Sequence, residues 1–330
     1  MYMQTRICAI DLFSGCGGMS LGFENAGFDI NCAFDHWEAA INVYRLNFSH
    51  PIFQVDLGNL NGDYSRFFEF KADVIIGGPP CQDFSHAGKR DEDLGRADLT
   101  LNYAEIVAHV KPSYFVMENV ERAAKSKRFK QARDIFKNAG YGVTEKILDA
   151  SLCGVPQSRK RVFLIGELNG KDGFLDCYLE SKLSEKPLTV GEYFNNVLNK
   201  NLGTQYYYRH PRNYSRRAIY GIDEPSATIR GVNRPIPANY LGHPADAAPV
   251  SDKVRPLTYT ERSYIQTFPY DFIFKGTKSD IEQMIGNAVP VKLAEYVAKA
   301  LREYIKDKQT GNVSETEFQI RLLESKTLYH

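Results

Sequence analysis

The chain has 330 residues, of which 43 % are apolar and 25 % are charged, and its formal net charge is +1. This composition is typical of a soluble globular protein with one large domain and a smaller one, and it excludes a polycation, so any nucleic-acid surface must come from a local concentration of basic residues. No signal peptide or membrane span is recognised, and the six cysteines are scattered without a CxxC pair, which disfavours a zinc site or a disulfide framework and predicts a reducing cytoplasm.

The N-terminal part has the pattern of a nucleotide-binding corner. Residues 6–13 predict a core strand, residues 14–18 form a Gly-rich turn, and residues 19–26 predict a helix. A strand, a Gly-rich turn and a helix in this order are typical of a doubly wound fold. A purely structural turn explains one such match equally well.

Two carboxylates follow at the ends of the next strands. The strand predicted over residues 30–34 ends at Asp35, where a doubly wound fold places an acidic residue for a ribose. Its simpler alternative role is a helix N-cap. Residues 55–57, Val-Asp-Leu, end a third strand and bring Asp56 to the same sheet edge.

A cysteine stands at the abrupt end of another strand. Residues 74–85 read VIIGGPPCQDFS. The β-branched run predicts a buried parallel strand, the glycines permit a close approach, and the prolines stop the strand. Cys81 is therefore expected on a stiff loop beside a cleft, as a nucleophile requires, although most lone cysteines are buried and structural. The polar stretch 86–98 predicts either an ordinary loop or a lid over a substrate.

Charged residues follow the next two strands. A helix over 99–110 leads to a strand over 114–117, which ends at Glu118, an acid/base partner for Cys81 or a charge at the start of a helix over 121–139.

After a strand over 143–148, Arg159 and Arg161 alternate before a strand over 162–166 and should share one face. Two guanidinium groups there suit a phosphate or a developing anion, or they form a solvated edge.

Beyond residue 166 the regular alternation of strands and helices stops. Arginines gather among tyrosines, asparagines and glycines in residues 206–217 and 227–235, which predicts a nucleic-acid surface in place of a merely solvated face. Residues 255–268 predict a short helix that starts near Thr258 or Thr260 and stops at Pro269. A helix over 291–306 follows residues 286–287, whose N–H groups are expected to be available to an anion.

Six stretches of the chain resemble the DNA (cytosine-5) methyltransferases, above all the small bacterial enzymes of restriction–modification systems. They read DLFSGCGG from Asp11, GGPPCQDFS from Gly77, MENV from Met117, QSRKR from Gln157, RPLT from Arg255 and IGNAVP from Ile285, and they occur in the family's order. The resemblance implies an α/β fold, with a Rossmann-like, S-adenosylmethionine-dependent large domain on a mostly parallel sheet. It places the catalytic and cofactor-binding domain at 1–166, a small irregular target-recognition domain at 167–254, and a hinge helix with a C-terminal segment that returns to the catalytic domain at 255–330.

The resemblance also implies the cofactor, S-adenosyl-L-methionine, and no metal. Asp35 would hold the ribose hydroxyls, and His36, or Trp37 beside it, would face the adenine. The cofactor-binding residues implied are Phe13, Ser14, Gly15, Gly18, Asp35, His36, Asp56, Leu57, Pro79, Leu101, Asn287 and Val289.

The implied reaction transfers a methyl group to C5 of a cytosine that is flipped out of a short, palindromic, GC-containing duplex site. Cys81 adds to C6, Glu118 contacts N3 and the exocyclic amine, and Arg159 and Arg161 hold the substrate. The DNA-binding residues implied or nominated are Gln82, Ser85, Arg209, Arg212, Arg216, Arg217, Thr228, Ile229, Arg230 and Arg234.

The resemblance further implies a monomer in the bacterial cytoplasm that protects host DNA beside a cognate restriction endonuclease. The main alternative is a tRNA methyltransferase built on the same motifs, but its Cys-Phe-Thr signature is missing from this sequence. A catalytically silent DNA-binding relative is disfavoured by the intact motif residues, and an oxidoreductase by the glycine spacing.

Overall fold

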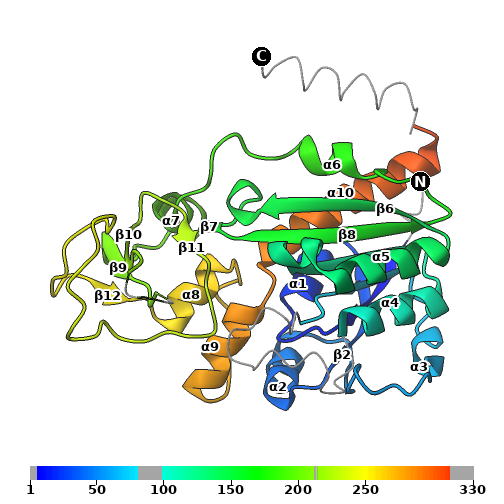
Figure 1. Ribbon diagram of the computed structural model, residues 1–330, viewed down its shortest axis with the longest axis horizontal. Coiled ribbons are helices and arrows are strands. Elements are labelled where there is room, and N and C mark those ends of the chain that lie inside the picture. Colours follow the sequence, from blue (N-terminus) through cyan, green and yellow to red (C-terminus); the bar gives the residue numbers. More distant parts are fainter. Residues whose placement is uncertain (1–5, 81–98, 212, 214, 313–330) are drawn as a thin grey trace.

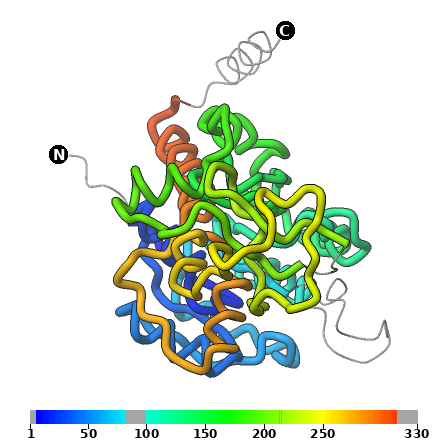
Figure 2. Tube along the Cα trace, turned by 90° about the vertical axis from the view of Figure 1, so that its left-hand side faces the viewer, coloured from blue at the N-terminus to red at the C-terminus, as the bar shows by residue number. Residues whose placement is uncertain are grey.

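The computed structural model describes residues 6–80, 99–211, 213 and 215–312. Figure 1 shows a large α/β domain on one side and a smaller, irregular lobe on the other. In Figure 2 the molecule is seen from the side of that lobe, whose yellow trace lies towards the viewer.

A seven-stranded sheet forms the centre of the large domain, in the order β3-β2-β1-β4-β5-β8-β6. The first five of these are parallel, and β8 runs antiparallel to both β5 and β6. The mostly parallel α/β fold is therefore confirmed. The strands are β1 (Cys8–Leu12), β2 (Asp29–Asp35), β3 (Ile52–Gln54), β4 (Val74–Gly77), β5 (Tyr114–Val120), β6 (Tyr141–Asp149) and β8 (Lys160–Leu168).

Helices cover both faces of this sheet because its central strands are buried on both sides. One apolar cluster joins the sheet to α1 (Gly18–Asn25), α6 (Asp176–Glu180) and α10 (Val291–Thr310). The other cluster joins it to α4 (Leu99–Val110) and α5 (Lys127–Asn138). The remaining helices of this domain are α2 (Glu38–Asn47), α3 (Ser65–Phe68), η2 (Glu121–Lys125) and η3 (Ala150–Leu152).

The smaller lobe is built on a three-stranded sheet in which β9 (Tyr206–Tyr208) pairs antiparallel with β10 (Ile219–Gly221) and parallel with β12 (Arg255–Pro256). A two-stranded parallel ladder of β7 (Gln157–Ser158) and β11 (Ser226–Ala227) joins the lobe to the large domain. Its helices are α7 (Val190–Glu192), η4 (Tyr193–Val197), α8 (Tyr259–Ile265) and α9 (Lys278–Asn287), which share a core around Tyr207, Ile229 and Ile285.

Several predicted boundaries are wrong. The third strand ends at Gln54, before the expected Val-Asp-Leu, because the Asp56 side chain accepts a hydrogen bond from the Gly58 N–H and turns the chain (2.9 Å). The helix expected over 121–139 is two elements, since Ser126 caps a new helix by accepting from the Phe129 N–H.

The prediction for residues 286–287 is also wrong. Both residues belong to the last turn of α9, a helix that was not predicted and that begins after its N-cap, Thr277. Their N–H groups therefore lie inside a helix and are not available to an anion. The helix expected over 255–268 covers only Tyr259–Ile265, and Thr267 then takes a left-handed conformation, with φ 62°, two residues before Pro269. Thr258 is its N-cap, one of the two threonines expected.

Phe174, Leu175 and Leu179 pack in the same cluster as α10 although they lie in the segment 167–254. The domain boundaries stay a prediction. Within the described part of the chain, none of the helices combines the length and the apolar character needed to cross a membrane.

Candidate active site

The candidate site lies where the carboxyl ends of β1, β4 and β5 meet. The strand register aligns Leu12 with Gly77 and Gly77 with Met117, so the residues after these positions come together at one edge. A β-carbon added at Gly77 would lie 2.3 Å from the Leu12 carbonyl oxygen. The close approach of these backbones therefore requires glycine at this position.

Asp35 braces the Gly-rich turn after β1. Its Oδ2 accepts a hydrogen bond from the Gly15 N–H at 2.7 Å, and its Oδ1 accepts one from the Trp37 N–H at 2.8 Å. Trp37, and not Asp35, is the N-cap of α2. Because each carboxylate oxygen offers further lone pairs, this arrangement leaves capacity for a hydroxyl ligand.

The backbone of the turn is unusual as well. Phe13 has φ 59°, and Gly15 and Gly17 have φ 55° and 96°. Left-handed conformations at three positions within five residues make this turn tight, and the Gly15 and Gly17 N–H groups donate to Asp35 and to the Ser14 carbonyl. Ser14 is buried, and its N–H donates to the Phe34 carbonyl at 3.2 Å.

The connection between α9 and α10 lies against this corner although it is about 270 residues away in the chain. A β-carbon at Gly18 would lie 2.4 Å from the Val289 carbonyl oxygen, and one at Gly78 would lie 4.0 Å from the Val289 side chain. Asn287 is exposed, and its Oδ1 accepts from Gln283. The motif near the C-terminus is thus beside the first one.

The remaining predicted cofactor residues fall around the same corner. Leu57 is buried in the apolar cluster that joins the sheet to α4 and α5, and Leu101 packs against the same cluster. The Asn102 side chain donates to the Leu57 carbonyl at 2.9 Å. Pro79 is buried and accepts from Asn119 at 3.1 Å. His36 and Asp56 are exposed. Whether these residues bind a cofactor stays a prediction.

Glu118 and Arg161 form a nearly buried ion pair beside Gly78. The Arg161 Nε lies 2.8 Å from Glu118 Oε1, and the two side chains are 13 % and 10 % exposed. Burial raises the pKa of Glu118, while Arg161 and Arg159 oppose the rise. A carboxyl with a raised pKa, held against a guanidinium, is suited to donating a proton or hydrogen bond to a ring nitrogen.

Cys81, Gln82, Ser85 and the stretch 86–98 lie outside the described residues. The residues just before Cys81 are described: β4 ends at Gly77, and the Pro79 carbonyl accepts a hydrogen bond from Asn119.

Arg159 has surroundings quite different from those of Arg161. It is 2 % exposed, and its guanidinium donates to the backbone carbonyls of Ile229, Gly286 and Ala288 at 3.0–3.3 Å. Gln157 and Gln266, which the sequence reading did not single out, are fully buried next to it and hydrogen-bonded to each other.

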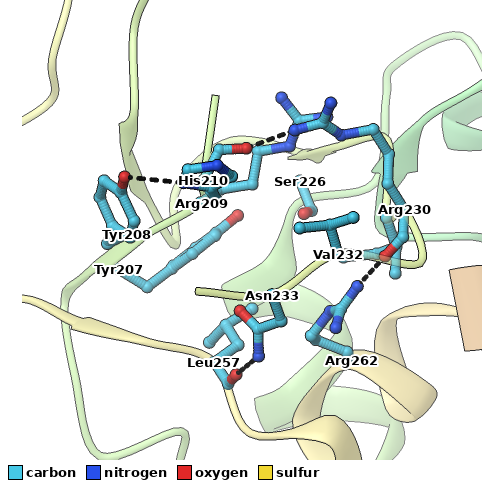
Figure 3. Close-up of a pocket in the computed structure, with 11 residues that line it drawn as sticks. Tyr207, Tyr208, Arg209, His210, Ser226, Arg230, Val232, Asn233, Leu257 and Arg262 are labelled. Carbon is cyan, nitrogen blue, oxygen red and sulfur yellow. Dashed lines mark hydrogen bonds between the residues drawn. The ribbon is translucent and has the colours of Figure 1, made fainter. Parts of the chain in front are cut away.

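The lobe gathers several of the predicted DNA-binding residues around one small pocket. Figure 3 shows Arg209, His210 and Arg230 lining it together, with Arg230 donating to the His210 carbonyl. Arg209 donates to the Thr228 carbonyl at 2.9 Å. Burial lowers the pKa of His210, and Arg234, Arg230 and Arg209 lower it further, which marks a concentrated positive potential.

The other candidates differ in their partners. Arg217 forms an ion pair with Glu224 and lies over the Tyr220 ring at 4.4 Å, so it is tied into the lobe. Arg216 and Arg234 are exposed. Arg262, which the sequence reading missed, is buried, pairs with Glu282, and donates to the Arg230 carbonyl (Figure 3). Arg212 lies outside the described residues.

Comparison with known proteins gives the same assignment as the six motifs. The model of the C-5 cytosine-specific DNA methylase family matches residues 7–303. The chain is 58 % identical over 299 residues to the Type II methyltransferase M.HindV of Haemophilus influenzae, covering 90 % of this chain and 97 % of that protein. It is 55 % identical over 305 residues to M.HgiDI of Herpetosiphon aurantiacus, covering 92 % and 97 %.

Solved structures confirm the fold. The crystal structure of the S. pombe Dnmt2 methyltransferase superposes with a TM-score of 0.67 at 20 % identity, covering 91 % of this chain and 99 % of that one. With a family model that spans most of the chain and two relatives above half identity, the chain belongs to the C-5 cytosine-specific DNA methylase family and is a DNA cytosine-5 methyltransferase.

Proposed function

We propose that this DNA methyltransferase takes its methyl group from S-adenosylmethionine and transfers it to a flipped-out cytosine through a covalent adduct with Cys81. One observation carries this assignment of the site. The Glu118–Arg161 pair, the strand that leads to Cys81 and the Gly-rich corner braced by Asp35 all stand at the same sheet edge.

The residues of the corner fit the proposed cofactor. The tight Gly-rich turn lets the methionine part approach its backbone closely, and the spare lone pairs of Asp35 suit ribose hydroxyls. Leu57 and Leu101 offer an apolar edge for the adenine. When bound, the cofactor supplies an electrophilic methyl group, which the protein itself lacks.

Cytosine C5 is a poor nucleophile, so the ring has to be activated first. In the proposed reaction the Cys81 thiolate bonds to C6, and the displaced ring electrons make C5 an enamine carbon. The activated C5 would then accept the electrophilic methyl group supplied by a cofactor that the Gly-rich turn and Asp35 would hold. A water molecule takes the C5 proton, and the electrons of that C–H bond re-form the ring double bond as Cys81 leaves.

Glu118 and Arg161 stabilise the activated ring. Addition of the thiolate at C6 pushes electron density onto N3, where a protonated Glu118 donates a hydrogen bond or a proton. The low exposure of the pair strengthens this interaction, because little water screens it. Arg161 holds the Glu118 side chain in place and contributes positive charge beside it.

The base must leave the DNA duplex to reach this edge, which costs a few kcal/mol of stacking and pairing. We assign base reading to the lobe, where the arginines around His210 and the exposed Arg234 suit the major-groove edge of guanine. The proposal includes a monomer that acts in the bacterial cytoplasm and protects DNA beside a cognate endonuclease. The relatives' names, which are those of Type II methyltransferases, support the restriction–modification role.

Replacing Cys81 by alanine tests the covalent step. We expect Cys81→Ala to lose methyl transfer from labelled S-adenosylmethionine while its affinity for DNA and cofactor changes little, since the thiolate acts after binding. Cys177→Ala, in α6 away from the sheet edge, is the matched control and should retain full activity. Methyl transfer by Cys81→Ala at the wild-type rate would refute the assignment.

A further inference from the structure

Arg159 is a buried cation whose hydrogen bonds go to the protein itself. Its Nη1 donates to the carbonyls of Ile229 at 3.0 Å and Gly286 at 3.2 Å, and its Nη2 donates to those of Gly286 at 3.3 Å and Ala288 at 3.1 Å. Burial lowers its pKa well below the usual value. Such a charge is tolerated only where hydrogen bonds replace water.

The C-terminus of α9 supplies much of that compensation. The last carbonyls of a helix lack partners inside the helix and carry the negative end of its dipole. Gly286 and Ala288 are at this end, where Gln266 also donates, to the Ile285 carbonyl at 2.5 Å and the Ala288 carbonyl at 3.0 Å. Arg159 and Gln266, which belong to other parts of the chain, therefore cap the C-terminus of α9 with their side-chain donors.

Gln157 extends the same network into the lobe. Its Nε2 donates to Gln266 Oε1 at 2.7 Å, and its Oε1 accepts from the Ile229 N–H at 2.8 Å. Ile229 thus has its N–H bound by Gln157 and its carbonyl bound by Arg159. The neighbouring Thr228 hydroxyl donates to the Ser158 carbonyl at 3.0 Å.

This network lies between three functional regions. Arg161, two residues after Arg159, pairs with Glu118. Val289, directly after Ala288, lies beside Gly18 of the cofactor corner, where a β-carbon would come within 2.4 Å of the Val289 carbonyl oxygen. Arg230, directly after Ile229, lines the arginine-rich pocket of the lobe (Figure 3).

We propose that Arg159, together with Gln157 and Gln266, is a positioning residue that locks the recognition lobe onto the catalytic edge. In this role Arg159 does not contact a DNA phosphate, because doing so would leave the Ile229 and Gly286 carbonyls without their side-chain donor and would remove one of the two donors to the Ala288 carbonyl. The lock couples correct base reading to placement of the cytosine at Glu118. The effect of Arg159 on methylation rests on the function proposed above, whereas its effect on hydrogen exchange in the protein without DNA does not.

The test compares Arg159→Met with Arg302→Met. Arg302 also donates to a backbone carbonyl, that of Ala26, but in the contact between α1 and α10 away from the lobe. Hydrogen exchange of the whole protein is measured first, without DNA. We expect Arg159→Met to exchange roughly five-fold or more faster within residues 226–234 and 284–289, as loss of about one hydrogen bond implies, while Arg302→Met leaves both segments protected.

DNA binding and methylation then separate positioning from phosphate contact. For Arg159→Met we expect the slope of log affinity against log salt to stay as in the wild type, and the ratio of methylation at correct sites to that at one-mismatch sites to fall. A phosphate ligand would instead reduce the slope by about 1 and leave the site preference intact.

Two results for Arg159→Met would refute the positioning role of Arg159. One is unchanged hydrogen exchange in residues 226–234 and 284–289, and the other is a reduced salt slope with an unchanged site preference. If Arg159→Met does not fold, Arg159→Lys takes its place, because a single ammonium replaces only part of the three-carbonyl contact and should give the same changes to a smaller degree. If the wild-type protein methylates no DNA, the proposed function fails, and the hydrogen-exchange experiment still decides whether Arg159 positions the lobe.

Discussion

Glu118 takes its chemistry from burial more than from its charged partners. Desolvation raises its pKa, and the guanidinium of Arg161, only 2.8 Å away, offsets the rise without cancelling it. The motif indicated an acid at this strand end. The direction of its pKa shift could not be predicted, because that shift depends on how completely β5, β8 and Gly78 exclude water.

The raised pKa of Glu118 predicts a pH effect on the rate. If the protonated form acts on N3, the single-turnover rate should fall as pH rises through the raised pKa of Glu118, because the proton is then lost. Glu118→Gln should be slower by roughly 10²-fold or more, in the range of general acid catalysis, and should lack this alkaline decline. The measurement is rapid-quench methylation across pH, and an unchanged decline in the variant would contradict the assignment.

Asp11 is a buried acid that the sequence motif contains but does not explain. It is fully buried and accepts a hydrogen bond from Ser20 at 2.5 Å, and Ser20 in turn contacts the Tyr44 hydroxyl at 2.7 Å. Its second oxygen has no hydrogen-bond donor among the described residues. Burial raises the pKa of Asp11 to about 7.

This shift predicts how stability depends on pH. The native state keeps the Asp11 proton up to about pH 7, whereas the unfolded chain loses it near pH 4, so the native state binds more protons between these values. The free energy of unfolding should therefore contain a contribution that falls by roughly 4 kcal/mol as pH rises from about 4 to 7. Asp11→Asn, which cannot ionise, should lack it.

Urea unfolding of both proteins at several pH values measures this difference. The relevant quantity is the gap between wild type and Asp11→Asn, since other groups titrate in both. A gap that stays constant from pH 4 to pH 7 would show that Asp11 is not the group responsible.

At the scale of elements, α1 and α10 pack in close contact. A β-carbon at Gly22 would lie 2.5 Å from the Ala294 β-carbon and 2.6 Å from the Val291 carbonyl oxygen. The two helices join parts of the chain that are about 270 residues apart in sequence, and Val289, just before α10, lies beside the cofactor corner. Gly22 is therefore a packing requirement, although alanine is the better helix former.

We predict that Gly22→Ala lowers the free energy of unfolding by about 1–3 kcal/mol, because overpacking outweighs the gain in helix propensity. Asn25→Ala, at the exposed end of the same helix, is the control and should change stability little. Chemical denaturation with S-adenosylmethionine absent isolates the packing effect. Equal stability of Gly22→Ala and wild type would mean that the helices separate without cost.

The elements also show which sequence patterns predict structure well. The buried β-branched run of residues 74–76 predicted a central strand, and the helix predicted over 99–110 has the same bounds as α4. α9 was missed because its sequence mixes charges and apolar residues and contains Gly286 next to Asn287, a pair typical of loops. Thr277, a residue type that is common at helix N-caps, was the signal in the sequence from which the start of α9 could have been predicted.

For the whole molecule, six short motifs in order were enough to predict the family and the fold, and three of them, those that begin at Asp11, Gly77 and Met117, mark strand ends that a parallel sheet brings to one edge. The partners of Arg159 could not be predicted in this way. Its acceptors are 70 to 129 residues away and are backbone carbonyls, which leave no mark on residue type. The same limit applies to the arginines of the lobe, whose carbonyl and carboxylate partners appear only in the folded chain.

The central claim concerns what the whole molecule does to DNA. Its most direct test is to incubate the protein and S-adenosylmethionine with DNA of mixed sequence and to locate methylated cytosines by bisulfite sequencing. The account predicts methyl groups at C5 within one short sequence motif, and none with Cys81→Ala. Unmethylated DNA, from a protein shown to be folded and to bind the cofactor, would contradict the account and would make RNA the next substrate to try.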